Sequence, residues 1–158
     1  MKASKTIVGN EPITQEQAME WLQTEPGQET STIQRLTSAA RAFVENYCGL
    51  SLIETEIVLA WPNYEPVTTL PYGPVREVTS ITVDGEEVTP DTDYPGLCEY
   101  DAGYLKATYT AGFTEIPDDL LQVVYDILKI YFDARSTNVP IPQLLINTLE
   151  KHTTNLFL

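Results

Sequence analysis

TSTIQRLTSAARAFVENYCG, residues 30–49, carries the strongest helical pattern in the chain. Ser31 and Gln34 have the spacing of a capping box, and Gly49 can end a helix in the left-handed conformation. We therefore predict one amphipathic helix of about five turns, whose apolar side lies in the core of the domain. The residues of this apolar stripe are spaced by three and four: Ile33, Leu36, Ala40, Phe43 and Tyr47.

The size and charge of the chain limit its function. A chain of 158 residues fits one domain, which buries roughly 70% of its unfolded surface. Nine basic and 23 acidic residues give a net charge of −14, and residues 84–101 hold seven acidic residues without Lys or Arg. Such a surface repels nucleic-acid phosphate, which disfavours sequence-specific or tight DNA binding. Acidic residues that only keep the protein soluble are the alternative explanation.

The cysteines and the apolar segments bear on the compartment. Cys48 and Cys98 lie far apart in the sequence, so a disulfide framework is not indicated. No segment has the run of apolar residues that spans a bilayer, and residues 1–10 lack the apolar core of a secretion signal. We expect no membrane contact, and a protein that is cytosolic or assembled into something made in the cytosol.

The rest of the chain separates into helical and alternating parts. Thr14 and Gln17 start a short helix, expected at about 14–24. After Gly49 the period changes to two, which predicts a small antiparallel sheet of about four to six strands. Within it, Val67 to Leu70 suggests a hairpin return, and Asp84-Gly85 predicts a tight two-residue turn.

Pro117 begins a third helix in which apolar residues cover more than half of the circumference, so we expect burial on more than one side. A subunit interface is a second place for that surface. A short fourth helix is expected at about 142–151. The apolar tail that follows is either a docking peptide or a segment that folds onto its own core.

These elements predict an α+β fold: a mainly helical frame of about four helices, with a small antiparallel sheet inserted between the second and third helices. Residues 1–11 are expected as an extended or loosely ordered arm, and residues 12–158 as a single domain. The parts of this domain are two helices in 12–49, the β region in 50–112, two helices in 113–152 and the tail in 153–158.

The sequence lacks the motifs of common active sites. It has no glycine-rich phosphate loop, no Cys/His metal spacing and no nucleophile elbow. The carboxylates around Asp91 and Asp93 are better explained as solvated hairpin ends than as a calcium loop. We therefore predict no enzyme, and no catalytic, cofactor-binding or metal residues.

Three stretches together resemble a known family. They are EPITQEQAMEWL at 11–22, IQRLTSAARAFVENYCGLSLI at 33–53 and YTAGFTEIPDDLLQVVYDILKIYFDAR at 109–135. In order and spacing they are similar to the head–tail connector (adaptor, head-completion) proteins of tailed bacteriophages and prophages. Their shared features are the Glu-Pro-Ile-Thr opening, the paired alanines with Tyr-x-Gly, and the Tyr-x-Ala-Gly strand end before a Pro-initiated helix.

The resemblance implies a structural virion protein at the head–tail interface, synthesised in the host bacterial cytoplasm. It implies a homo-oligomeric ring, commonly a dodecamer, that binds below the portal protein and is monomeric when isolated. Such a ring extends the DNA channel and offers a platform for the tail or stopper protein. A negative channel would let DNA pass without specific binding.

The resemblance and the apolar pattern together suggest contact residues. We expect subunit contacts from the second and third helices, at Thr37, Arg41, Glu45, Val123, Ile130, Tyr131 and Arg135. We expect portal contacts from residues 142–158, at Leu144, Leu145, Leu149, Leu156, Phe157 and Leu158. Two alternatives stay open: a standalone acidic module that binds a basic partner, and an enzyme whose site no residue constellation supports.

Overall fold

A computed structural model of the chain describes residues 1–66, 68–91 and 93–153. The chain forms two compact units, each made from two separate segments. The sheet unit combines Met1–Asn10 with Ile53–Thr114. The helical unit combines Glu11–Leu52 with the residues from Glu115 onward.

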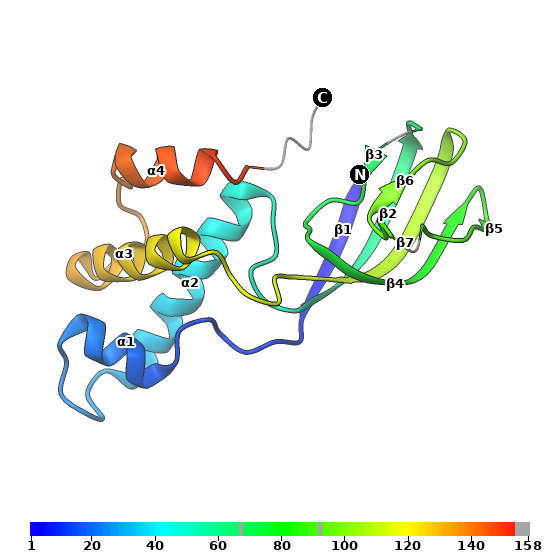
Figure 1. Cartoon of the computed structure of the whole chain (residues 1–158). Helices are drawn as coiled ribbons and strands as arrows, with labels where there is room; N and C mark the ends of the chain where they lie inside the picture. Colours follow the sequence, from blue (N-terminus) through cyan, green and yellow to red (C-terminus); the bar gives the residue numbers. More distant parts are fainter. Residues whose placement is uncertain (67, 92, 154–158) are drawn as a thin grey trace. The chain divides into compact units, whose positions relative to one another are not determined.

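The described part of the helical unit contains four helices (Figure 1). α3 packs against the other three, which explains why its apolar residues cover more than one side. Leu120, Val124, Ile127 and Leu128 of α3 are all fully buried. The prediction that this helix is buried on several sides is confirmed. The helices are α1 (Gln15–Leu22), α2 (Thr30–Cys48), α3 (Asp118–Ala134) and α4 (Gln143–Glu150).

The start of α1 and the end of α2 follow from local chemistry. Thr14 caps α1, and its hydroxyl and backbone exchange hydrogen bonds with Gln17, as predicted. Gly49 ends α2 with φ 69°, also as predicted. The capping box expected at Ser31 is wrong, because α2 already begins at Thr30 and its N-cap is Glu29, without a side-chain cap.

The described residues of the sheet unit form an antiparallel five-stranded sheet in the order β1-β2-β7-β4-β5. β3 and β6 form a separate two-stranded sheet, so the hairpin return expected at 67–70 is wrong. The strands are β1 (Lys2–Ile7), β2 (Thr55–Tyr64), β3 (Thr68–Thr69), β4 (Val75–Val83), β5 (Glu86–Glu87), β6 (Leu97–Cys98) and β7 (Gly103–Ala111).

β1 corrects the predicted fold class. We expected the sheet to lie wholly between the second and third helices, but its first strand comes from the N-terminal residues, ahead of α1. Lys2 pairs with Ala60 and Ile7 with Thr55, so the partner strand lies about fifty residues further along. β1 is an edge strand with nearly every side chain exposed. It therefore lacks the apolar alternation that would have identified it as a strand.

One face of the large sheet forms the core of the sheet unit. Ile57 and Leu59 of β2 are buried there with Leu105 and Tyr109 of β7, as the period of two predicts. The Tyr109 hydroxyl donates to the backbone oxygen of Pro71 at 2.6 Å. Burial also raises the pKa of Tyr109. The core therefore keeps its tyrosine hydroxyl neutral and hydrogen-bonded.

Two glycine positions have a clear conformational role. Asp84 and Gly85 both have positive φ, 52° and 88°, which confirms the predicted tight turn between β4 and β5. Gly112 follows β7 with φ 129°, and a Cβ there would overlap the backbone of Ile53 and Glu54. Residue 112 therefore has to be glycine for these two segments to lie so close. None of the described helices is long and apolar enough to cross a membrane.

Candidate functional site

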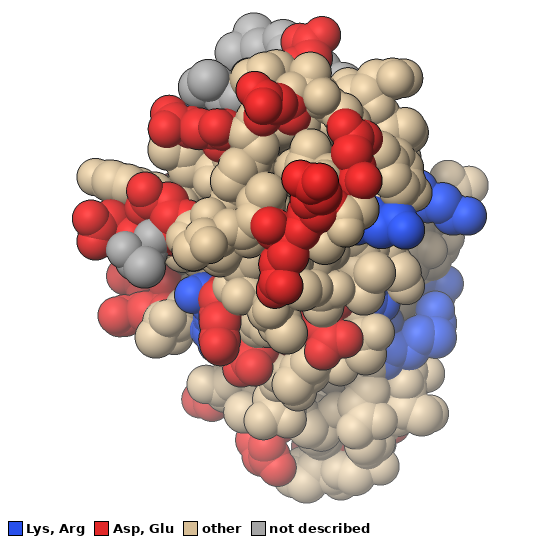
Figure 2. Space-filling view, turned by 90° about the vertical axis from the view of Figure 1, so that its right-hand side faces the viewer, with Lys and Arg blue, Asp and Glu red and all other residues tan. Residues whose placement is uncertain are grey.

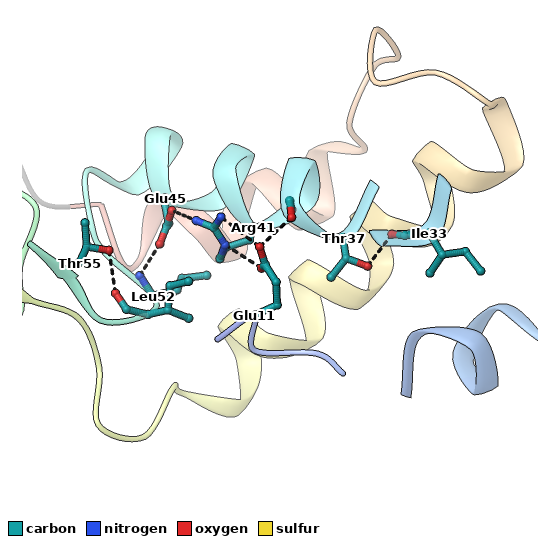
Figure 3. Close-up of polar contacts among 9 residues, drawn as sticks. Glu11, Ile33, Thr37, Arg41, Glu45, Leu52 and Thr55 are labelled. Carbon is teal, nitrogen blue, oxygen red and sulfur yellow. Dashed lines mark hydrogen bonds and ion pairs between the residues drawn. The ribbon is translucent and has the colours of Figure 1, made fainter. Parts of the chain in front are cut away.

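Arg41 of α2 is the centre of a buried polar network (Figure 3). Its Nε lies 2.8 Å from Oε2 of Glu11, and its Nη1 lies 2.5 Å from Oε2 of Glu45. The Ser38 hydroxyl donates to Oε1 of Glu11 at 2.7 Å. Only 4% of Arg41 is exposed to solvent. Burial acts to lower the pKa of Arg41, but the two carboxylates outweigh it and raise the pKa, so the guanidinium stays charged.

The same network holds two ends of the helical unit. Glu11 is its first residue, and the backbone N–H of Leu52, the last residue of that segment, donates to Oε1 of Glu45 at 2.8 Å. Arg41 therefore links the point where the chain enters the helical unit to the point where it leaves for the sheet unit. Breaking such a pair leaves an uncompensated buried charge, which is strongly destabilising.

Arg76 is the centre of a similar polar network in the sheet unit. Its Nε donates to the Gly112 oxygen at 2.8 Å, its Nη2 donates to the Phe113 oxygen, and its Nη1 lies 3.1 Å from a Glu54 carboxylate oxygen. The Glu54 backbone oxygen in turn accepts the N–H groups of residues 8 and 9, both at 2.9 Å. In each unit, one arginine network thus connects segments that lie next to the points where the chain passes from one unit to the other.

The predicted subunit contacts of α2 lie largely inside the helical unit. Arg41 and Thr37 are buried, and the Thr37 hydroxyl donates to the Ile33 oxygen at 2.9 Å. The Glu11 carboxylate pairs with the Arg41 guanidinium, and only 4% of Arg41 is exposed. Glu45 is half-buried within the same network. Contact of these residues with a neighbouring subunit stays a prediction.

The predicted residues of α3 are divided between its interior and its surface. Val123 and Tyr131 are buried, whereas Ile130 is half-buried and Arg135 is exposed. Arg135 forms a bidentate ion pair with Glu29, the N-cap residue of α2. Arg135 therefore joins the end of α3 to the start of α2 within the helical unit.

The predicted residues of α4 also differ in exposure. Leu144 is 76% exposed, Leu145 is half-buried and Leu149 is fully buried. The Leu149 oxygen accepts from the Cys48 thiol at 3.5 Å, which holds α4 on the end of α2. Leu156, Phe157 and Leu158, the other predicted portal contacts, lie outside the described residues. Of the α4 residues, Leu144 is the one that presents an apolar side chain to solvent.

The contacts of His152 and the burial of the two cysteines determine what chemistry these side chains can perform. His152 lies 2.6 Å from the Asp119 carboxylate at the start of α3. Its hydrogen bond lowers the pKa of Asp119. Cys48 and Cys98 are both buried, and burial raises the pKa of each to about 11. Neither thiol is therefore ionised at neutral pH, and a thiolate nucleophile is not formed. The Asp91 carboxylate accepts the N–H groups of Asp93 and Tyr94, which closes a turn.

A family model decides the class of protein. The model described as head completion protein matches residues 11–139, which include Arg41, Arg76 and the residues that both arginines contact, and most of both units. The chain belongs to the head completion protein family. Membership makes it a structural protein rather than an enzyme, and it confirms the family resemblance of the three sequence stretches.

Solved structures share the fold of this head completion protein. A chain in the virion of a native gene transfer agent (GTA) particle is 20% identical with a TM-score of 0.76, over 100% of this chain and 98% of that one. A chain in the neck of an empty GTA particle, computed with C6 symmetry, is 22% identical with a TM-score of 0.72. It too covers 100% of this chain and 98% of its own.

A third chain, from the neck of a native GTA particle computed with C12 symmetry, is 21% identical with a TM-score of 0.67. It covers 98% of this chain and 97% of its own. No curated protein matches the head completion protein described here. At these identities the likeness is one of fold, and it extends over β1 and α4, which lie outside the family-model match.

Sequence reasoning missed several members of the two networks. Glu11 lies 30 residues before Arg41, and Gly112 lies 36 residues after Arg76. Neither separation corresponds to a period of a helix or a strand. The family resemblance did include Glu11, as the first residue of its Glu-Pro-Ile-Thr opening, but this opening gave no indication that the carboxylate is an ion-pair partner.

Proposed function

We propose that this head completion protein forms a ring below the portal of a phage-like particle. In this role it is part of the neck, extends the DNA channel and offers a platform for the tail or stopper protein. The observation that carries the proposal is membership of the head completion family. The shared fold with chains from GTA necks, one of them in a particle computed with C12 symmetry, supports a ring of twelve copies.

The charge of the chain supports the passage of DNA. Its net charge is −14, and Figure 2 presents a face on which acidic side chains outnumber basic ones. Duplex DNA carries one charge for about every 1.7 Å of its axis, so an acidic channel wall repels it. We expect DNA to slide through the ring without specific binding.

The exposed end of α4 is the proposed contact with the portal. Leu144 presents its side chain to solvent, and Pro140 and Pro142 beside it are exposed as well. A large apolar residue so exposed in an acidic protein is suited to an apolar pocket of a partner. Leu149 is buried in the described chain and has the different role of holding α4 on α2.

The residues proposed as subunit contacts also differ in their exposure to solvent. Ile130 and Arg135 keep part of their surface available in the described chain. Thr37, Arg41, Val123 and Tyr131 are buried, so their contribution is to shape the helical unit that presents the ring surface. We propose that copies remain monomeric in isolation and meet on the portal.

Sedimentation of the purified chain with portal rings of its own particle tests the proposal. We expect the chain to sediment alone as a monomer, and to join the rings in a fixed stoichiometry when mixed with them. A chain that stays free of the portal at all concentrations would instead favour the alternative, a standalone acidic module for a basic partner. The net charge of the chain, −14, is the observation that favours this second function.

A further inference from the structure

The two edges of the five-stranded sheet differ in what they present. β1 forms one edge, and β4 with the short β5 forms the other. Within the described residues, β1 pairs only with β2, and β5 pairs only with Thr82 and Val83 of β4. Both edges therefore keep backbone groups that could meet a further strand.

The side chains at these edges carry opposite charge. The first ten residues contain Lys2 and Lys5 and no acidic residue, in a chain that is otherwise strongly acidic. Lys2 is exposed, and Nζ of Lys5 lies 3.7 Å from the centre of the Tyr72 ring. The opposite edge carries three exposed carboxylates, at Glu77, Glu86 and Glu87, and its cation Arg76 is already paired with Glu54.

The β1 edge also exposes apolar surface. Ile7 is 53% exposed and Val8, just after β1, is 60% exposed, and no described strand of the chain pairs with β1 on its outer side. Lysines at an edge discourage pairing with arbitrary strands. A partner edge that carries carboxylates removes this penalty and makes the pairing selective.

We propose that the β1 edge of one copy lies against the β4–β5 edge of the next copy. The inference rests on the proposed ring and names the surfaces that build it. Because two different patches of the chain meet, the contact is head-to-tail, and its repetition closes a ring when the rotation between neighbouring copies divides a full turn. Each neighbouring pair of strands from β1 to β4 is antiparallel. A neighbour in the same orientation therefore presents β1 antiparallel to β4.

A pair of introduced cysteines tests which surfaces meet. Ser4→Cys and Glu87→Cys place thiols on the two edges, at exposed positions on the same face of the sheet. Within one chain four strand spacings separate them, about 19 Å, which is too far for a disulfide. The natural cysteines are buried. Oxidation in the presence of portal rings should therefore give a ladder of covalent oligomers from the double variant, and monomers from either single variant.

Charge reversal supplies an independent test. One variant carries Lys2→Glu with Lys5→Glu, and the other carries Glu86→Lys with Glu87→Lys. In either variant alone, like charges meet at the contact. We expect its affinity in assembly on the portal to fall about tenfold. Mixing the two restores opposite charges at every contact, so the mixture should assemble. Lys106→Glu, at an exposed position of the inner strand β7, is the control and should assemble normally. Should the first variant not fold, Lys2→Glu alone replaces it.

The outcomes separate this contact from the portal role. Variants that assemble on the portal as the unmodified chain does, with no covalent ladder from the cysteine pair, would overturn the edge contact and leave the portal role standing. A covalent ladder at high concentration from a chain that never joins the portal would support the edge contact and reject the portal role. If neither a ladder nor portal binding is observed, both are wrong.

Discussion

The guanidinium of Arg41 and the carboxylate of Glu11 form a buried ion pair with Nε 2.8 Å from Oε2. The two residues lie 30 positions apart, and the pair fixes the entry of the chain into the helical unit against the middle of α2. Through Glu45, the same guanidinium also fixes Leu52, where the chain leaves this unit.

Arg41→Ala should lower the free energy of unfolding by about 3 kcal/mol, because it leaves the Glu11 and Glu45 carboxylates without their cation. Urea denaturation measures this change. Arg35→Ala, at an exposed position of the same helix, is the control and should change stability by less than about 0.5 kcal/mol. Equal effects of the two substitutions would show that the network contributes little.

A double-mutant cycle isolates the pair itself. Glu11→Ala combined with Arg41→Ala should cost less than the sum of the single substitutions, because each single change already removes the contact. Additive effects in urea denaturation would mean that the two side chains do not stabilise each other.

Gly112→Ala should destabilise the chain far more than Gly27→Ala. Both glycines have positive φ, but a Cβ at residue 27 meets nothing within 4 Å, whereas one at residue 112 overlaps the backbone of Ile53 and Glu54. Backbone strain alone costs about 1–2 kcal/mol, and residue 112 adds the displacement of a neighbouring segment. Thermal unfolding of the two variants compares them. A similar loss of Tm in both would contradict the close approach.

The pair of Asp119 and His152 predicts a pH dependence. The hydrogen bond from His152 lowers the pKa of Asp119 in the folded chain. The contact therefore stabilises the fold above the unfolded carboxyl pKa of about 3.9, and this contribution is lost as the pH falls through the folded pKa. NMR titration of the Asp119 carboxyl should give a midpoint below the usual value, and His152→Ala should raise it. A midpoint that His152→Ala leaves unchanged would assign the shift to another cause.

Leu144→Gln and Leu149→Ala should have opposite effects. Leu144 is exposed, so its substitution should leave stability within about 0.5 kcal/mol but weaken binding to portal rings. Leu149 is fully buried, and its truncation should cost about 2–5 kcal/mol. Denaturation and portal sedimentation of both variants make the comparison. Full portal binding by Leu144→Gln would remove α4 from the proposed interface.

Local patterns predicted those parts of the fold that local chemistry determines. α2 and its end at Gly49 follow from apolar spacing and a left-handed cap. The turn at Asp84-Gly85 follows from two positive φ angles that these residues adopt readily. In each case the information lies within a few residues of the feature itself.

Features set by distant partners were not predictable in this way. β1 is exposed on nearly every position, and its identity as a strand comes from pairing with β2. Thr37 and Arg41 lie outside the predicted apolar stripe, yet the helical unit encloses them and the Glu11 carboxylate pairs with the arginine. Helical periodicity reports which residues share a side, but not whether a distant carboxylate covers that side.

Electron microscopy of the neck of particles that carry this chain shows whether the proposed ring exists. We expect a closed ring of copies directly below the portal, with the helical unit and the sheet unit of each copy repeated around the DNA channel. Particles in which this position holds no copy of the chain, or holds it outside a ring, would contradict the account.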